Sequence, residues 1–219
     1  MKADVLVLAT LATLCSILVY TDACSCMLSH PQQHYCNSDF VILARVKRER
    51  IHADSRIYKV RVRREYKISE KGTLALKSGR LITAVWDSMC GTRLQPGKLY
   101  VLSGRIFSLK AYINLCNMAV EWDTLTRRQR KGLKLMYKHG CSCQIKRCLA
   151  TEQRCPRHVD SCNWGNDCET KEGICMRQAN NSCMWTRNRA LAKCTKEWRK
   201  NLTANASHKR EPTLLYHLP

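Results

Sequence analysis

The chain has 219 residues, a formal net charge of +21 and 15 cysteines. This length allows one or two domains, and no stretch approaches the roughly 20 apolar residues that a bilayer span needs. So large an excess of basic side chains attracts polyanions. We expect sulfated glycosaminoglycans as partners rather than nucleic acid, because they are the abundant polyanions outside the cell.

Residues 1–23 are typical of a secretory signal peptide. Met1-Lys2 gives a positive start, residues 5–19 are mostly apolar, and Thr21-Asp22-Ala23 puts small residues before a cleavage site. Cleavage after Ala23 would make Cys24 the first residue of a secreted, extracellular protein. Its free α-amino nitrogen and its carbonyl oxygen could then grip one metal ion together.

The part up to about Gly140 is predicted to be rich in β-strands. Apolar or alternating runs predict strands at residues 39–46, 58–63, 81–85, 99–102 and 106–115. Turn signals separate them at Lys71-Gly72, Ser78-Gly79, Gln95-Pro96-Gly97 and Ser103-Gly104. Five short strands with this spacing predict a small closed barrel of the OB-fold type.

Two helices are predicted beside these strands. Ser29-His30-Pro31 is expected to start a short helix that carries Cys36. Thr124 is expected to cap a second helix that ends near Gly140. Its inner face would hold Leu125, Leu133, Met136 and Tyr137, and its outer face Arg127, Arg128, Arg130 and Lys131.

Fourteen cysteines remain after the signal peptide, and nine of them lie between Cys141 and Cys194. In an oxidising compartment they predict up to seven disulfides, with the dense part stapled rather than built on a large core. A zinc site near Cys141-Ser142-Cys143 is the alternative, but the paired C-x2-C spacing of structural zinc sites is absent. Three histidines lack a paired helical spacing with carboxylates, so we interpret them as surface or capping residues: His30, His34 and His139.

These patterns predict a mainly β protein with helices, divided into four parts. They are a signal peptide (1–23), an N-terminal OB-fold domain (24–141), a small disulfide-rich domain (142–200) and a flexible tail (201–219). Glycosylation acceptor patterns occur at Asn180, Asn201 and Asn205. Trp122, Trp164 and Trp185 are interpreted as packing residues.

Several segments closely resemble the tissue inhibitors of metalloproteinases. They are residues 24–46, Ser88-Met89-Cys90-Gly91, Asn114-Leu115-Cys116, Trp122-Asp123-Thr124-Leu125, residues 140–148 and residues 181–185. The resemblance covers Cys24 to about Trp185. It implies a netrin-like inhibitory barrel, an activity as inhibitor rather than enzyme, and no cofactor of its own. The zinc would belong to the target, a secreted or membrane-anchored matrix or disintegrin-type metalloproteinase.

The resemblance also implies which cysteines pair. Three pairs would staple the N-terminal barrel: Cys24–Cys90, Cys26–Cys116 and Cys36–Cys141. Three would staple the second domain: Cys143–Cys183, Cys148–Cys155 and Cys162–Cys175. Cys168 and Cys194 depart from the family's usual twelve cysteines, and their simplest assignment is a seventh disulfide. The sequence leaves other pairings within the second domain open.

An inhibitory site around Cys24 is the main functional expectation from the resemblance. The Cys24 amine and carbonyl would chelate the target's zinc, and the side chain of Ser25 would enter the S1′ pocket. Asp87, Ser88 and Met89 would cover the opposite side of the cleft, beside Cys24 through Cys90. Residues 46–56 look short for a hairpin that extends this contact in relatives, so we expect that auxiliary contact to be small.

Each assignment has a plainer alternative. Cys24 could be an ordinary half-cystine with an inert amine, Ser25 a spacer between Cys24 and Cys26, and Met89 a residue packed against the barrel. The whole chain could be a non-inhibitory, matrix-binding netrin-like module. No nucleophile–base pair, paired carboxylates or H-E-x-x-H motif suggests an enzyme.

A glycosaminoglycan-binding patch is predicted from the charge pattern. It would join a basic strand face to the outer face of the second helix and would retain the protein in the extracellular matrix. The protein is expected to be a monomer. Its residues are Lys59, Arg61, Arg63, Arg127, Arg128, Arg130 and Lys131.

Overall fold

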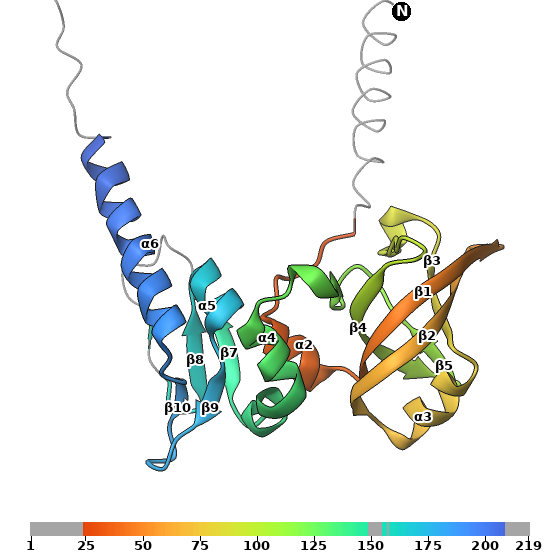
Figure 1. Cartoon of the computed structure of the whole chain (residues 1–219), viewed down its shortest axis with the longest axis horizontal. Coiled ribbons are helices and arrows are strands. Elements are labelled where there is room, and N and C mark those ends of the chain that lie inside the picture. Colours follow the sequence, from red (N-terminus) through yellow and green to blue (C-terminus); the bar gives the residue numbers. More distant parts are fainter. Residues whose placement is uncertain (1–23, 149–154, 157, 209–219) are drawn as a thin grey trace, which may run out of the picture. The chain divides into compact units, whose positions relative to one another are not determined.

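The computed structural model describes residues 24–148, 155–156 and 158–208 (Figure 1). The predicted signal peptide lies outside this range. Contacts divide the described chain into two compact units. The barrel unit holds residues 24–28 and 39–122, and the second unit holds residues 29–38 and 123–208. The predicted domains were continuous in sequence, whereas each compact unit joins two separate segments.

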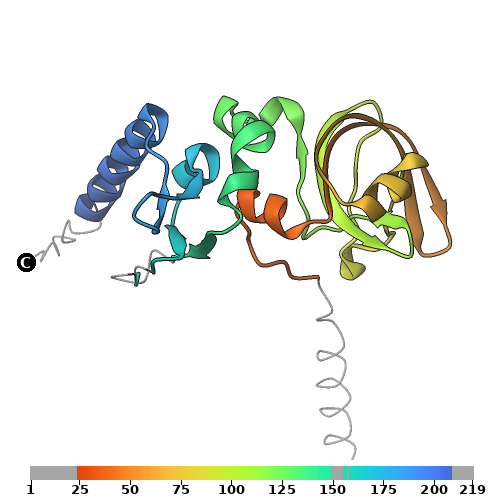
Figure 2. The ribbon, with the colours of Figure 1, turned by 90° about the horizontal axis from the view of Figure 1, so that it is seen from below.

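The barrel unit contains the predicted closed sheet. In the order β1-β2-β3-β5-β4, neighbouring strands pair, and β1 also pairs with β4 to close the ring. The strands curve around a common core (Figures 1 and 2). Their bounds are β1 Phe40–His52, β2 Ser55–Ile68, β3 Arg80–Ala84, β4 Leu99–Phe107, β5 Lys110–Tyr112 and β6 Ala119–Glu121, which pairs with β4. The prediction of a five-stranded OB-type barrel is confirmed.

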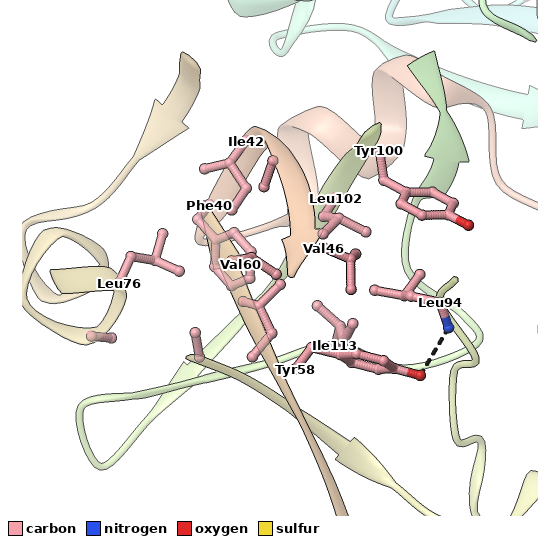
Figure 3. Close-up of a cluster of buried hydrophobic side chains, with 14 residues drawn as sticks. Phe40, Ile42, Val46, Tyr58, Val60, Leu76, Leu94, Tyr100, Leu102 and Ile113 are labelled. Carbon is pink, nitrogen blue, oxygen red and sulfur yellow. Dashed lines mark hydrogen bonds between the residues drawn. The ribbon is translucent and has the colours of Figure 1, made fainter. Parts of the chain in front are cut away.

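The barrel core is a cluster of buried apolar side chains. Alternate positions of β1 supply Phe40, Ile42, Ala44 and Val46, as the period of two along a strand requires. Other strands and segments add further members of the cluster: Tyr58, Val60, Leu76, Leu94, Tyr100, Leu102 and Ile113 (Figure 3). The Tyr58 hydroxyl is satisfied inside this core, because it accepts from the Leu94 N–H at 2.8 Å and donates to the Thr92 carbonyl at 3.2 Å.

The two strands of the β1–β2 hairpin extend beyond their predicted bounds, which were residues 39–46 and 58–63. The two strands stay paired as far as His52 opposite Ser55, and only Ala53 and Asp54 form the turn. Ala53 has a φ of 48°, which a two-residue hairpin turn of the primed type requires. Residues 47–52 are basic and mixed in composition, so their sequence alone does not predict a strand. Pairing with β2 makes them one.

Helix α3, Glu70–Lys77, was not predicted; a turn was expected at Lys71-Gly72 instead. Ser69 caps the helix by accepting from the Gly72 N–H at 3.1 Å. Gly72 is buried, and a Cβ there would lie 3.0 Å from a side-chain carbon of Ile68. The glycine therefore marks close packing inside a short helix rather than a turn.

In the second unit, the predicted helix after Ser29 is α2, Pro31–Asn37, with His30 as its N-cap. The second predicted helix is present, but Thr124 is the wrong cap. Thr124 ends a 3-10 turn, Trp122–Thr124, whereas Thr126 caps α4, Arg127–Lys131, in a capping box with Gln129. A π-helical turn, Gly132–Met136, and a 3-10 turn, Tyr137–Gly140, follow. Leu125, Leu133 and Tyr137 are buried as predicted.

The remainder of the second unit is stapled, as expected. Strand β7, Gln144–Arg147, runs parallel to β8, Ser161–Trp164, and β9, Cys175–Arg177, is antiparallel to β10, Cys183–Trp185. Their small core consists mostly of cysteines, with Ile145, Trp164 and Trp185 packed among them. Helices α5, Asp167–Glu172, and α6, Arg189–His208, complete the unit. Residues 201–208 of the predicted tail are therefore helical, and residues 209–219 lie outside the described part.

The disulfide Cys36–Cys141 was expected to staple the barrel, but both cysteines belong to the second unit. Helix α2 explains this. Its buried Gln32 donates to the carbonyl oxygens of Gly140, at 3.1 Å, and Cys175, at 2.7 Å, and accepts from the Cys175 N–H at 2.9 Å. Tyr35 also packs edge-on against Tyr137. Among the described residues, no helix is both long and apolar enough to cross a membrane.

Candidate functional site

The fourteen cysteines of the described chain form seven disulfides. These are the pairs implied by the family resemblance, together with the added pair Cys168–Cys194. Two of them hold the first described residues to the barrel unit. Cys24 is joined to Cys90, and Cys26 to Cys116, each with a Cα–Cα distance of 5.1 Å.

These two disulfides lie side by side. The four sulfur atoms of Cys24, Cys26, Cys90 and Cys116 lie within 4.8 Å of one another. Four thiolates in such an arrangement would resemble a structural zinc site, but sulfurs that are consumed in disulfides are not thiolate ligands. The cluster therefore anchors the segment, and Ser25 and Met27 stay exposed on either side of Cys26.

The segment from Trp86 to Cys90 is the second part of the candidate site. It forms a 3-10 turn, Asp87–Met89, in which the Trp86 carbonyl accepts from the N–H groups of Met89, at 3.1 Å, and Gly91, at 3.0 Å. All of Trp86, Asp87, Ser88 and Met89 are exposed. Met89 has 61% of its surface exposed, which argues against packing on the barrel as its role.

Gly91 lets the end of this turn press against β3. A Cβ at this position would overlap the carbonyl oxygen of Ala84 and lie 2.9 Å from that of Trp86. On the other side, the Cys90 carbonyl accepts from the Leu115 N–H at 2.8 Å, one residue before Cys116. The backbone thus connects the partners of Cys24 and Cys26 directly.

Sequence reasoning missed the residues that support this segment. Arg93 pairs with Asp87 through two N–O contacts of 3.3 and 3.4 Å on the exposed surface. Behind the segment, Val85 donates its N–H to the Asp54 carbonyl at 3.1 Å, so the hairpin turn contacts it. Buried Arg56 reaches the Val85 carbonyl at 3.4 Å and forms an ion pair with Glu49. The alternating pattern of β2 gave no signal for Arg56, because it occupies a position that the pattern reserves for apolar residues.

The three histidines differ in environment. His139 is exposed and His34 is half-buried, whereas His30 is fully buried, so of the two predicted roles, surface or capping, His30 has the second. It does cap α2, since Nδ1 accepts from the Gln32 N–H at 3.1 Å, and Nε2 lies 2.9 Å from the Glu169 carbonyl. Burial lowers the pKa of His30 to about 4 and also lowers the pKa of His34. Trp164 and Trp185 lie against the His30 ring, which fits their interpretation as packing residues.

The predicted basic patch is distributed over both units. Lys59, Arg61 and Arg63 are exposed along one face of β2 in the barrel unit. In the second unit, Arg127 and Lys131 are exposed on α4, but Arg128 and Arg130 are half-buried. Arg128 donates to the Thr186 hydroxyl at 2.6 Å and Arg130 to the Asp123 carbonyl at 3.4 Å, so both have structural partners.

A basic hollow adjoins Lys59 on the barrel unit. Its volume is about 330 Å³, and most of its lining side chains are basic. They are Arg48, Arg50, His52, Lys59 and Arg80, with Ile51 and Ile57. The sequence analysis did not single out Arg50 or Arg80, because pairing between β1, β2 and β3 brings them together only in the fold.

The glycosylation acceptor sites differ in their surroundings. Asn180 is exposed, and its side-chain oxygen accepts from the Ser182 N–H at 3.2 Å and from the Ser182 hydroxyl at 2.7 Å. Asn201 is exposed on α6. Asn205 also lies in α6, and its side chain lies outside the described part.

Comparison with known proteins agrees with this geometry. Residues 22–185 match the family model described as tissue inhibitor of metalloproteinase. The chain is 35% identical to a tissue inhibitor of metalloproteinase of Drosophila melanogaster, over 79% of this chain and 86% of the relative. It is 34% identical to metalloproteinase inhibitor 3 of Scyliorhinus torazame, over 78% of this chain and 84% of the relative. It is 32% identical to metalloproteinase inhibitor 2 of Homo sapiens, over 84% of this chain and 90% of the relative. The chain therefore belongs to the tissue inhibitor of metalloproteinase family, a family of inhibitors and not of enzymes.

Proposed function

We propose that the chain is secreted and inhibits zinc metalloproteinases with its mature N-terminus. The zinc of such an enzyme has three protein ligands and a water that performs hydrolysis. After cleavage behind Ala23, the Cys24 α-amino nitrogen and carbonyl oxygen would displace this water and chelate the zinc in a five-membered ring. The Cys24 sulfur takes no part, because it is joined to Cys90.

The observation that supports this proposal best is the double anchoring of the first residues. The disulfides of Cys24 and Cys26 hold the chelating end beside the exposed turn Asp87–Met89. An end that is already ordered avoids the entropic cost of ordering on binding. Ser25 would enter the S1′ pocket, and Asp87, Ser88 and Met89 would cover the other side of the cleft. A small serine fills a deep apolar pocket poorly, which favours a broad range of targets.

An added residue tests the chelation directly. A mature protein with one alanine before Cys24 replaces the free amine with an amide, which does not coordinate zinc at neutral pH. We expect its inhibition constant against a purified metalloproteinase to rise by orders of magnitude. Ser25→Ala, which keeps the amine, is the matched control and should change inhibition far less. Full activity of the extended protein would contradict the chelation mechanism, and N-terminal sequencing of the secreted protein would establish the cleavage site.

Retention in the extracellular matrix is the second part of the proposal. The basic hollow and the β2 face carrying Lys59, Arg61 and Arg63 support binding of sulfated glycosaminoglycans. The alternative function is a netrin-like, matrix-binding module without inhibition. A natural mature protein that binds heparin but inhibits no metalloproteinase would favour this alternative.

A further inference from the structure

Helix α6, Arg189–His208, begins after the matched family region has ended at residue 185. It lies beside α5 (Figure 1) and is fixed to it by a hydrogen bond and a disulfide. Asn188 accepts from the Leu191 N–H at 2.8 Å, and its side-chain amide donates to the Glu172 carbonyl at 3.0 Å. Six residues later, Cys194 is joined to Cys168. The disulfide Cys168–Cys194 therefore holds α6 in place.

The two faces of α6 differ completely in chemistry. Its half-buried residues are spaced as one helical face: Leu191, Cys194, Thr195 and Trp198. The opposite face carries a row of cations spaced by four, three and four residues: Arg189, Lys193, Lys196 and Lys200. We call this row the α6 cation row. With a rise of about 1.5 Å per residue, it extends over roughly 16 Å.

Helix stability does not explain the α6 cation row. The helix dipole favours acidic side chains in the first turn and basic ones in the last. The first turn of α6 holds no acidic residue and begins with Arg189. Between residues 189 and 200 there is a single acid, Glu197, against five cations. The positive charge at the start of the helix therefore opposes the dipole.

Two members of the α6 cation row, Lys196 and Lys200, also lie beside a hollow. A hollow of about 600 Å³ along the same helix is lined by Ala192, Thr195, Lys196, Arg199 and Lys200. Charges of one sign around a hollow concentrate the field there and raise the local concentration of anions.

We propose that α6 is a docking helix for sulfated glycosaminoglycans, separate from the basic face of the barrel unit. A rigid row of cations fits an extended chain with repeated anionic groups. A membrane surface fits less well, because interfacial helices insert several large apolar side chains. Among the described side chains of α6, Leu191 and Trp198 are half-buried and only Leu202 is an exposed large apolar residue. The inference shares its ligand class with the proposed matrix retention but rests on different residues.

The test measures binding of the full-length mature protein to heparin across a series of salt concentrations. The α6 variant replaces the cation row with glutamine: R189Q, K193Q, K196Q and K200Q. A matched control removes one arginine and three lysines elsewhere on the second unit: K134Q, K138Q, K146Q and R147Q. A barrel variant carries K59Q, R61Q and R63Q. A conservative variant, K193R, K196R and K200R, keeps the charge.

We expect the α6 variant to bind heparin about tenfold or more weakly, since each exposed ion pair contributes a small amount. Its binding should also depend less steeply on salt. The matched control should lose clearly less, and the conservative variant should bind like the natural protein. All variants should keep their helical circular dichroism.

Three outcomes would overturn the inference. Either the α6 variant and the matched control weaken binding equally, or the natural protein binds anionic phosphatidylserine vesicles as tightly as heparin through the α6 cation row. If the barrel variant alone loses binding, matrix retention stands and the α6 inference fails. Metalloproteinase inhibition is measured in parallel, so a failure of the chelation proposal is recognised separately.

Discussion

At the scale of single residues, Cys90 and Gly91 determine where Cys24, the proposed zinc-binding residue, is held. Cys90 has a φ of 58°, in the left-handed region that costs an L-residue about 1 kcal/mol or more. Its N–H donates to the Asp87 carbonyl at 3.0 Å, and the next N–H donates to that of Trp86. This sharp turn aims the Cys90 sulfur at Cys24, and it needs a residue without a Cβ at position 91.

Replacing Gly91 with alanine should therefore damage the site. Because the new Cβ would overlap backbone carbonyl oxygens, the turn Asp87–Met89 must shift. We expect inhibition to weaken at least tenfold and thermal stability to fall. Gly97→Ala is a suitable control, because Gly97 has a φ of 84° but no atom within 4 Å of its Cβ position. That variant should lose stability while its inhibition constant stays close to that of the natural protein.

The α-amine of Cys24 predicts how inhibition depends on pH. An α-amino group has a pKa of about 8, and only its unprotonated form coordinates zinc. Protons therefore compete with the metal below that pH, and the inhibition constant should rise by up to about tenfold per pH unit. Measurements from pH 8.5 to 6 would check this, with a zinc-chelating inhibitor that lacks an amine correcting for the enzyme. A flat corrected profile would speak against coordination by the amine.

At the scale of elements, the β1–β2 hairpin supports the exposed turn from behind. Pairing of Ser55 with Ala84 continues the sheet up to the point where β3 ends, and the Asp54 carbonyl accepts the next N–H, that of Val85. Arg56 is 8% exposed and connects Glu49 on β1 to the Val85 carbonyl. The hairpin, for which sequence analysis expected only a small auxiliary contact with the enzyme, is thus a scaffold for the candidate site.

Arg56→Met should lower both stability and inhibition. Removing Arg56 leaves the half-buried carboxylate of Glu49 without its partner, at a cost of about 2 kcal/mol. Urea unfolding and the inhibition constant measure the two effects. Arg61→Met, on the exposed face of the same strand, should change neither by much. Equal effects of the two substitutions would argue against a supporting role of Arg56.

Helices and strands were predicted best from the sequence where a single local pattern was sufficient to identify the element. The alternation of β2 and the proline after His30 were sufficient for a strand and a helix. Thr124 and Thr126 both fit an N-cap, and only the capping box with Gln129 decides between them. Helix α3 has a buried glycine, Gly72, in its first turn. Glycine has a low helix propensity and therefore argues against a helix, but at this position it allows close packing with Ile68. The contacts of Arg50, Arg56 and Arg80 depend on the register in which strands pair, and the sequence of one strand does not determine that register.

At the scale of the whole molecule, the chain passes between the two units three times. Residues 29–38 leave the barrel unit, form α2 within the second unit and return at residue 39. His30 and Gln32 fix this excursion, because both are buried and both bond to distant parts of the second unit. The stability of the whole second unit therefore depends on a short segment that lies far from it in sequence.

Acid should weaken the second unit through His30. Its folded pKa of about 4 lies below the usual value of 6.5, so the unfolded chain binds the proton first as pH falls. Stability is fully present above pH 6.5 and decreases between about 6.5 and 4, by up to about 3 kcal/mol. The lowered pKa of His34 acts in the same direction.

Urea unfolding between pH 7 and 4.5 would measure this decrease. His30→Asn keeps a side-chain acceptor for the Gln32 N–H and should flatten the pH dependence, even though its stability at pH 7 is lower. His139→Asn changes an exposed histidine and should leave the slope unchanged. A slope that persists without His30 would assign the acid sensitivity to other groups.

The route of the chain also gives the candidate site a sensitivity to reducing agents. Residues 24–28 belong to no described helix or strand, and the chain that follows them enters the second unit before it returns to the barrel. Their attachment to the barrel is the pair of disulfides at Cys24 and Cys26. The cluster of buried apolar side chains that forms the barrel core contains no cysteine. A thiol reductant would therefore release the proposed zinc-binding end while the barrel stays folded, and reoxidation would restore it.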